Sequence, residues 1–195
     1  AGIEMADCSL IRDGGLAHFI TRRFDRNGAD PHVHSLGGMT HTDFHQPGLY
    51  SYEQLFRLIL RLGGDSAMLH EAFRRAVFNL MARNQDDHVK NTAFLLDRQG
   101  RWRLSPAYDL TYARGRGFTR VHQMSLAGKR DGFEAADLLA VGERIGLRRA
   151  GRGVIEQVAE ALSHWAQEAM DADVPKDLVA RIGGEFRLEL ATQSE

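Results

Sequence analysis

The chain has 195 residues, of which 43% are hydrophobic and 26% charged, and its formal net charge at pH 7 is −1. A chain of this size forms one domain, or a domain with a small lobe, and buries about 70% of the surface that its unfolded form exposes. The near-neutral charge excludes the polybasic field that dominates nucleic-acid affinity, so neither DNA nor an anionic membrane is predicted as a primary partner.

Two further features of the composition point to the cytoplasm. The single cysteine, Cys8, cannot form an internal disulfide, and no apolar run reaches the roughly 18 residues that a membrane span needs. Residues 1–5 lack the basic and apolar regions of a signal peptide. We therefore expect a cytoplasmic protein that makes no membrane contact.

Residues 1–50 are predicted to form short strands and turns. The segment 16–24 is rich in β-branched and aromatic residues, which favours a strand. In residues 23–26, arginine and acid alternate in a way that is typical of a solvated ion-pair edge. Turn signals recur at Asn27-Gly28, Asp30-Pro31 and Gly37-Gly38.

Four histidines lie between residues 32 and 45. Pairs two apart on a strand, or four apart on a helix, share a face, so a zinc site is geometrically conceivable. The His-Glu-x-x-His pattern is absent and Pro47-Gly48 follows at once, so hydrogen-bonded histidines are the better interpretation. The four residues are His32, His34, His41 and His45.

Two helices are predicted before the most polar stretch. Ser51 is a suitable N-cap for a first helix that Gly63-Gly64 would stop. Asp65 can cap a second helix, in which apolar residues recur at helical spacing to about Ala82. Three more helices are predicted after Phe133, over residues 135–145, 150–170 and 176–190.

The nonapeptide 83–91 carries five charged or imidazole side chains and three amides, which is typical of a site and not of a linker. Residues 92–96 read as a strand, 97–100 as a turn and 101–104 as the returning strand. This hairpin should bring Tyr108 and Asp109 back beside the nonapeptide. The glycine- and arginine-rich segment 114–120 is predicted to be a loop that meets substrate or a partner.

The acids and amide of these stretches suit phosphoryl transfer. That chemistry needs hard oxygen ligands for Mg²⁺ and one carboxylate beside the attacking hydroxyl. In protein kinases the catalytic aspartate precedes a metal-binding asparagine by five residues, and a second metal-binding aspartate follows later. Asp86 and Asn91 have this spacing, and Asp109 follows the predicted hairpin.

The same stretches resemble the C-terminal lobe of HipA-like serine/threonine kinases, the toxins of bacterial HipA-HipB toxin-antitoxin modules. The resemblance extends over nearly the whole chain. It is carried by Val77-Phe78-Asn79, residues 84–91, residues 102–111, the hinge-like Arg23-Phe24-Asp25-Arg26, and His122-Gln123-Met124-Ser125 with Gly128.

This resemblance implies a role for each matching residue. Asp86 would be the catalytic base, and Asn91 and Asp109 would be Mg²⁺ ligands that also contact the nucleotide. The remaining residues that it implies for ATP binding are His88, Val89, Lys90 and Tyr108 at the phosphates and the backbone of Arg22, Arg23 and Phe24 at adenine. The acceptor would be a serine or threonine of a protein substrate.

The implied fold is mostly α within the α+β class, a helical lobe with short β-hairpins that carry the catalytic and metal-binding loops. Residues 1–195 would form one C-terminal kinase lobe, with hinge-proximal strands and turns in 1–50 and the helical lobe, including the hairpin 92–104, in 51–195. The family's N-terminal lobe, with its glycine-rich loop and strand lysine, is not visible, and Arg22 replaces the usual hinge glutamate.

Two functions follow from this pattern. The first is a catalytic lobe that binds ATP weakly and turns over poorly without a separate N-terminal lobe. The alternative is a truncated or degenerate lobe that binds an antitoxin-like protein, and through it DNA. Small-molecule kinases use similar spacings, so the protein acceptor depends on the family resemblance.

Overall fold

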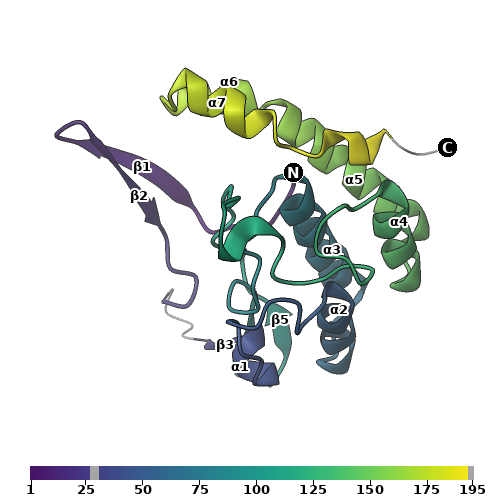
Figure 1. Ribbon diagram of the computed structural model, residues 1–195. Coiled ribbons are helices and arrows are strands. Elements are labelled where there is room, and N and C mark those ends of the chain that lie inside the picture. The colour runs from purple at the N-terminus through teal and green to yellow at the C-terminus, as the bar shows by residue number, and fades with distance from the viewer. Residues whose placement is uncertain (27–30, 193–195) are drawn as a thin grey trace.

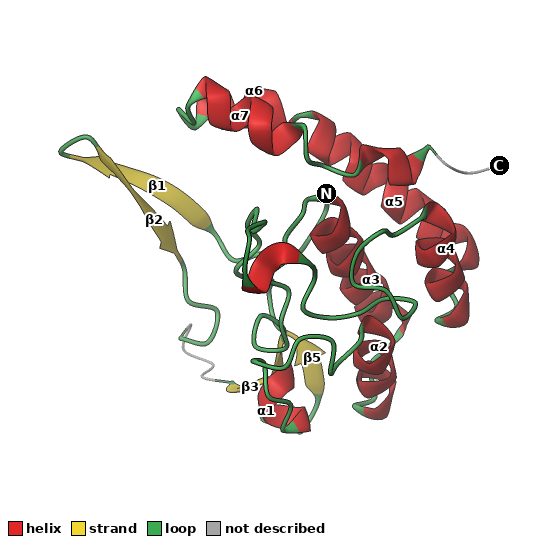
Figure 2. Ribbon diagram, viewed as in Figure 1, coloured by secondary structure: helices red, strands yellow, loops and turns green. Residues whose placement is uncertain are grey.

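The computed structural model describes residues 1–26 and 31–192. Within these residues there are seven α-helices and five β-strands, with 42% helix and 16% strand in small antiparallel sheets (Figures 1 and 2). The predicted class, mostly α within α+β, is confirmed. The turns predicted at Asn27-Gly28 and at Asp30 lie outside the described residues.

The elements alternate between short strands and helices before the chain becomes wholly helical. Their order is β1 (Cys8–Asp13), β2 (Leu16–Thr21), β3 (His32–Ser35), α1 (Leu36–Thr40), α2 (Tyr52–Arg61), α3 (Ser66–Met81), β4 (Ala93–Leu96), β5 (Trp102–Leu104), α4 (Ala135–Arg144), α5 (Arg148–Ser163), α6 (Trp165–Asp171) and α7 (Lys176–Gly183), with 3₁₀ turns η1 (Phe118–Arg120) and η2 (Leu188–Ala191).

The strands form two separate antiparallel sheets. β1 and β2 make a two-stranded ribbon, all of whose residues are exposed, and it extends away from the body of the molecule (Figure 1). The second sheet has the order β3-β4-β5, with Leu95 opposite both Val33 and Arg103. The β4–β5 hairpin is the one predicted from the sequence, so that prediction is confirmed.

The first two long helices begin where their capping residues predict. Ser51 and Gln54 form a capping box at α2, in which each side chain bonds to the other's backbone N–H. The Asp65 carboxylate accepts a bond from the Met68 backbone at α3. Apolar residues of α3, such as Phe73 and Leu80, are fully buried at the centre of the core.

The C-terminal helices differ from the prediction. The single helix expected over 150–170 is two helices, α5 and α6, because His164 has ψ near 0° and interrupts the helical backbone. The helix expected over 176–190 ends at Gly183. The following Gly184 favours an end at this point, and the Arg187 backbone leaves the helical region, with ψ of 59°, to donate to the Met81 carbonyl.

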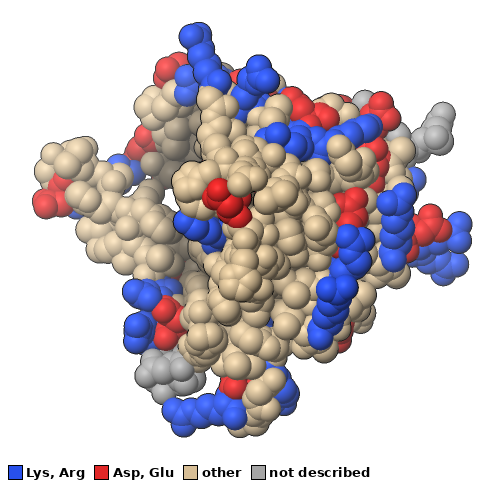
Figure 3. All heavy atoms as spheres, turned by 60° about the horizontal axis from the view of Figure 1, so that its bottom comes forward, with Lys and Arg blue, Asp and Glu red and all other residues tan. Residues whose placement is uncertain are grey.

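On one face of the molecule, charged side chains of both signs are mixed. Figure 3 shows basic and acidic side chains interspersed around an area of mostly uncharged residues on one face. This distribution agrees with a net charge of −1. In the described part of the chain, no helix is both long and apolar enough to cross a membrane.

Candidate active site

The nonapeptide 83–91 is held at a fixed place by the end of α3. After the helix ends, Arg83 adopts a left-handed conformation with φ of 58°, and the Asn84 N–H donates to the Asn79 carbonyl over 3.0 Å. This is the capping bond of a Schellman motif, in which the chain reverses sharply at the helix end. The loop therefore leaves the core helix in a defined direction.

Asp86 lies at the middle of this loop and remains accessible. Its side chain is 39% exposed, and one carboxylate oxygen lies 3.8 Å from His88 Nε2. Partial burial raises the pKa of Asp86, and the charges of Asp109 and Asp87 raise it further, whereas His88 opposes the shift. A half-exposed carboxylate with a raised pKa is a stronger base than an ordinary surface aspartate.

Asn91 is oriented by the backbone of Asp86. Its amide nitrogen donates to the Asp86 carbonyl over 2.9 Å, and its own N–H donates to the His88 carbonyl. Because the amide nitrogen is engaged, the amide oxygen is the end that can face a ligand. Asp86 and Asn91 are thus tied to one another within a single turn of the loop.

The β4–β5 hairpin returns the chain to this loop, as expected. The Asn84 side chain donates to the Asp109 carbonyl over 3.3 Å, and the Tyr108 hydroxyl donates to the Lys90 carbonyl over 2.6 Å. The Gln85 N–H donates to the Ala113 carbonyl, so the two segments also form a short parallel bridge. Asp109 is exposed and has a left-handed backbone, with φ of 55°.

A cleft of about 540 Å³ opens beside Asp109. The rings of Phe24 and Tyr108, with centroids 6.0 Å apart, both line it. Burial, with the Asp109 charge, raises the pKa of Tyr108 to about 12, so its hydroxyl stays protonated. The lining residues are Met5, Ala6, Cys8, Phe19, Thr21, Arg22, Arg23, Phe24, Asp25, Val33, Ala93, Ala107, Tyr108, Asp109, Leu110 and Thr111.

The predicted ion-pair edge forms one wall of this cleft. The Arg23 guanidinium donates two hydrogen bonds to the Asp25 carboxylate, from Nε to Oδ1 over 2.9 Å and from Nη2 to Oδ2 over 2.5 Å. These hydrogen bonds lower the pKa of Asp25 against a smaller opposing effect of burial. The pair agrees with the sequence interpretation, and the cleft brings together Arg22, Arg23, Phe24, Tyr108 and Asp109 among the predicted site residues.

The other predicted phosphate contacts lie apart from this cleft. The Val89 side chain is buried, and its carbonyl accepts a bond from Gly37. The ammonium of Lys90 lies over the Phe44 ring, 3.5 Å from its centroid. His88 accepts a bond from the Lys90 N–H over 3.3 Å. In this arrangement only backbone atoms of Val89 could face a phosphate, and Lys90 would have to leave Phe44.

The predicted Mg²⁺ ligands, Asn91 and Asp109, are compatible in their chemistry with that ion. In residues 1–26 and 31–192, no three His, Cys, Asp or Glu side chains gather closely enough to hold a metal ion by themselves. Mg²⁺ commonly takes one or two carboxylates together with substrate phosphates and water. Asp109 with the Asn91 amide is a set of hard oxygens of this kind. Of the four histidines between residues 32 and 45 that were considered as zinc ligands, His45 is hydrogen-bonded to Asp43, with 3.0 Å between Nδ1 and Oδ1.

Asp87, to which the sequence assigned no role in the site, anchors the loop. Its carboxylate is buried and accepts bonds from the Tyr52 hydroxyl over 2.7 Å, the Gln123 N–H over 2.7 Å and His122 Nδ1 over 2.9 Å. Burial alone would raise the pKa of Asp87, but His122 and the hydrogen bonds outweigh it and the pKa lies below its usual value. No local pattern signals these partners, which are 35 and 36 positions away.

The electrostatic interaction between Asp86 and Asp109 gives a testable expectation. Changing Asp109 to asparagine removes a negative charge that raises the pKa of Asp86, so the pKa of Asp86 should fall. Asparagine tolerates the left-handed backbone at this position, so the fold should persist. Carbon NMR of the Asp86 carboxyl across acidic pH measures this pKa. An unchanged or higher value would show that the two carboxylates do not interact.

Three comparisons with known proteins bear on this site. The family model for the HipA-like C-terminal domain matches residues 1–166. A putative kinase, Y4mE of Sinorhizobium fredii, is 29% identical over 120 residues, which cover 56% of this chain and 28% of that protein. A solved HipA from Shewanella oneidensis MR-1, in a complex with HipB and operator DNA, superimposes with a TM-score of 0.73 at 18% identity.

The solved structure agrees in fold over 98% of this chain but only 51% of its own. The chain therefore spans about half the length of that HipA and less than a third of the putative kinase. The resemblance read from the sequence is confirmed.

Proposed function

Because the chain belongs to the family of HipA-like C-terminal domains, we propose that it is the catalytic C-terminal lobe of an ATP- and Mg²⁺-dependent serine/threonine protein kinase of the HipA toxin type. The observation that carries this proposal is that Asp86 is linked both to Asp109, through its charge, and to Asn91, through a hydrogen bond. Asp86 lies close enough to Asp109 for the second charge to raise its pKa, and Asn91 is bonded to the Asp86 backbone.

In this proposal Asp86 accepts the proton of the attacking serine or threonine hydroxyl. Its partly exposed carboxylate can reach a protein side chain, and its raised pKa strengthens it as a base. Asp87 lies next in sequence but is buried and fully bonded, so it cannot approach an acceptor. The burial of one acid and exposure of the other distinguish their roles.

The cleft beside Asp109 is the proposed ATP site. Phe24 and Tyr108 supply apolar ring surface for adenine, and the backbone of residues 22–24 supplies hydrogen-bonding groups. Asn91 and Asp109 would hold Mg²⁺, which when bound neutralises charge on the phosphate oxygens. His88, Val89 and Lys90 would meet the phosphates, with Lys90 exchanging its contact with Phe44 for a phosphate.

We further propose that this lobe acts together with an N-terminal lobe. The β1–β2 ribbon exposes large apolar side chains on both of its faces, among them Leu16 at 65% and Phe19 at 67%, and exposed apolar surface of this kind is typical of an interaction site. A two-stranded ribbon is marginal alone. The solved HipA is bound to HipB and DNA, which supports an antitoxin-like partner for this chain and, through it, DNA.

The proposal is tested by incubating the purified chain with Mg²⁺, labelled ATP and a generic protein acceptor, with and without a polypeptide that supplies the N-terminal lobe. Labelled phosphoserine or phosphothreonine that depends on Mg²⁺ is expected, with more label when both lobes are present. Absence of label in both arms would contradict the enzyme and leave the alternative, a protein-binding lobe, for which an antitoxin-like protein is the ligand to test.

The role of Asp109 predicts a loss of nucleotide affinity. Asp109→Asn should weaken MgATP binding by about tenfold or more, because a charged ligand to the divalent ion is replaced by a neutral one. Isothermal titration calorimetry with MgATP measures the dissociation constant. Asp97→Asn, in the β4–β5 turn, is the matched control and should bind normally. Equal affinity of the Asp109 variant and wild type would remove Asp109 from the site.

A further inference from the structure

A continuous line of buried hydrogen bonds runs from the catalytic loop to the C-terminal segment. His122 lies between its two ends with no exposed side-chain surface. Its Nδ1 donates to Asp87 over 2.9 Å, and its Nε2 accepts from Arg187 over 3.1 Å. Since an arginine can only donate, the pair of bonds assigns the imidazole proton to Nδ1. Arg187 thus orients the His122 ring, and the His122 ring orients the Asp87 carboxylate.

Arg187 also holds the end of the helix that carries the loop. Its guanidinium donates to the Leu80 carbonyl over 2.8 Å, and its backbone N–H donates to the Met81 carbonyl over 2.9 Å. These two carbonyls belong to the last turn of α3, where a cation is electrostatically favoured. A further bond to Asp131 completes the guanidinium's contacts. Arg187 is therefore hydrogen-bonded to the end of α3, where the loop 83–91 begins, and through His122 it is connected to Asp87 in the middle of that loop.

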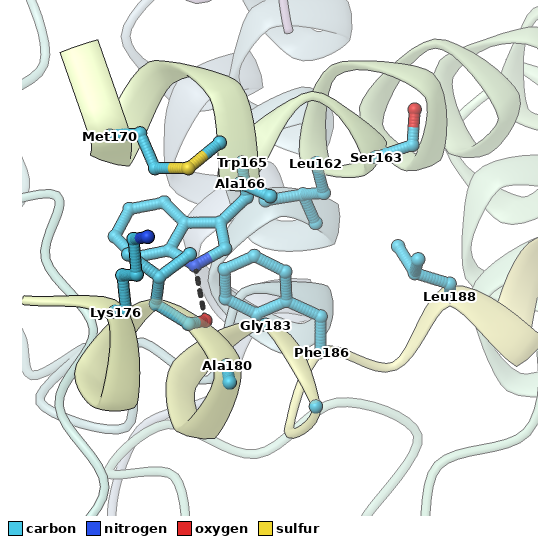
Figure 4. Close-up of a pocket in the computed structure, with 12 residues that line it drawn as sticks. Leu162, Ser163, Trp165, Ala166, Met170, Lys176, Ala180, Gly183, Phe186 and Leu188 are labelled. Carbon is cyan, nitrogen blue, oxygen red and sulfur yellow. Dashed lines mark hydrogen bonds between the residues drawn. The ribbon is translucent and has the colours of Figure 1, made fainter.

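The direction of Arg187 is determined by its neighbours in sequence. Phe186 and Leu188 line the apolar groove between α6 and α7, where the Phe186 ring meets Trp165 edge to face at 5.7 Å (Figure 4). With both neighbours in the groove, the intervening Arg187 side chain is directed to the other side, into the core. The side chain of Glu185, two residues earlier, pairs with Arg114 and with Tyr112, just beyond Asp109.

We infer that Arg187, acting through His122 and Asp87, is a positioning residue for the catalytic loop 83–91. The segment 185–188 thereby helps to hold the proposed site in place. This segment lies beyond residue 166, where the match to the family model ends. The kinetic part of this inference rests on the proposed kinase function. The positioning itself is a property of the loop and can be measured without any activity.

The first test compares two arginine variants. Arg187→Met keeps an unbranched apolar stem and removes every guanidinium bond, and Arg181→Met makes the same change at an exposed position of α7. Hydrogen exchange of amides 84–91 should accelerate about tenfold or more in the first variant and stay unchanged in the second, with α2 as internal reference. If the exchange of amides 84–91 accelerates no more than the exchange of the α2 amides, Arg187 only stabilises the whole fold and the inference is wrong.

A pair of histidine variants separates the two halves of the connection. Asparagine at 122 can reproduce the Nδ1 donor toward Asp87 but not the Nε2 acceptor, and glutamine can reproduce the acceptor toward Arg187 but not the donor. If positioning passes through the ring, His122→Asn and His122→Gln both accelerate loop exchange. Adding Arg187→Met to His122→Asn then changes little more, because residues that act in series are not additive. Full additivity would contradict the inference.

The kinetic readout distinguishes positioning from binding. Misplacing the loop should lower kcat by about 10- to 100-fold in Arg187→Met and raise the KM for ATP by a smaller factor, because the loop carries Asp86 and the proposed phosphate contacts whereas the cleft proposed for adenine is lined by other segments. Arg187→Lys, which can reach one carbonyl, should recover part of the rate. A raised KM with unchanged kcat would overturn the positioning role. An inactive wild type would count against the kinase proposal, and the exchange measurements would still decide the positioning.

Should Arg187→Met fail to fold, the His122 pair decides the question by itself. Each His122 variant retains one of the two bonds and a polar side chain, so less of the core is disturbed. Accelerated exchange at 84–91 relative to α2 in both variants supports the inference, and protection equal to wild type in either variant contradicts it.

Discussion

Asp86→Asn is expected to reduce labelled phosphate transfer by about 10²- to 10⁴-fold, the usual contribution of a general base, while the fold stays intact. The asparagine side chain has nearly the same shape but cannot accept the hydroxyl proton. Asp86 is partly exposed and accepts no hydrogen bond from the core, unlike its neighbour Asp87. Circular dichroism and the thermal midpoint should therefore match those of wild type.

The measurement is the initial rate with Mg²⁺, labelled ATP and a protein acceptor, in whichever lobe combination gives the highest wild-type rate. Asp171→Asn is the matched control, since Asp171 is an exposed aspartate at the end of α6, and it should retain full activity. A folded Asp86→Asn protein that keeps the wild-type rate would show that another group accepts the proton.

Asp87→Ala is expected to destabilise the protein by about 3–5 kcal/mol, because several buried hydrogen-bond donors lose their acceptor at about 1–3 kcal/mol each. The substitution leaves the Tyr52 hydroxyl, the Gln123 N–H and the His122 ring facing a cavity without their acceptor. Urea unfolding at constant m-value measures the change. Asp13→Ala, on the exposed ribbon, should change stability by less than about 0.5 kcal/mol.

The same residue predicts a loss of stability in acid. The pKa of Asp87 is lower in the folded protein than in the unfolded chain, so its contribution is complete above the unfolded value of about 3.9. That contribution is lost as the pH falls through the lower folded pKa. The stability of Asp87→Asn should therefore depend less steeply on pH in this range. Identical slopes for the variant and wild type would show that Asp87 does not hold its charge in the fold.

The parts of the fold that the sequence predicted well are those with local causes. The Ser51 and Asp65 caps act on backbone groups three residues away, and the β4–β5 hairpin joins adjacent strands across a short turn. Of the three predicted C-terminal helices, the first agrees with α4 to within one residue at each end, the second lacks the break at His164, and the third extends beyond the end of α7 at Gly183. The break at His164 coincides with the packing of Trp165 on Phe186, a contact between distant segments that periodicity does not register.

In the candidate site, too, the features with local causes were predicted and those set by contacts between distant segments were not. The spacing of Asp86 and Asn91, and the return of Asp109 after a hairpin, could be read along the chain because each depends on nearby residues. The amino-acid sequence by itself thus determined the family, the helical class and the acids that the chemistry requires. Which of two adjacent acids is exposed, and the dependence of the loop on His122 and Arg187, only the tertiary structure decided. Burial and hydrogen bonding between residues 35 to 107 positions apart arise from packing, which no local pattern encodes.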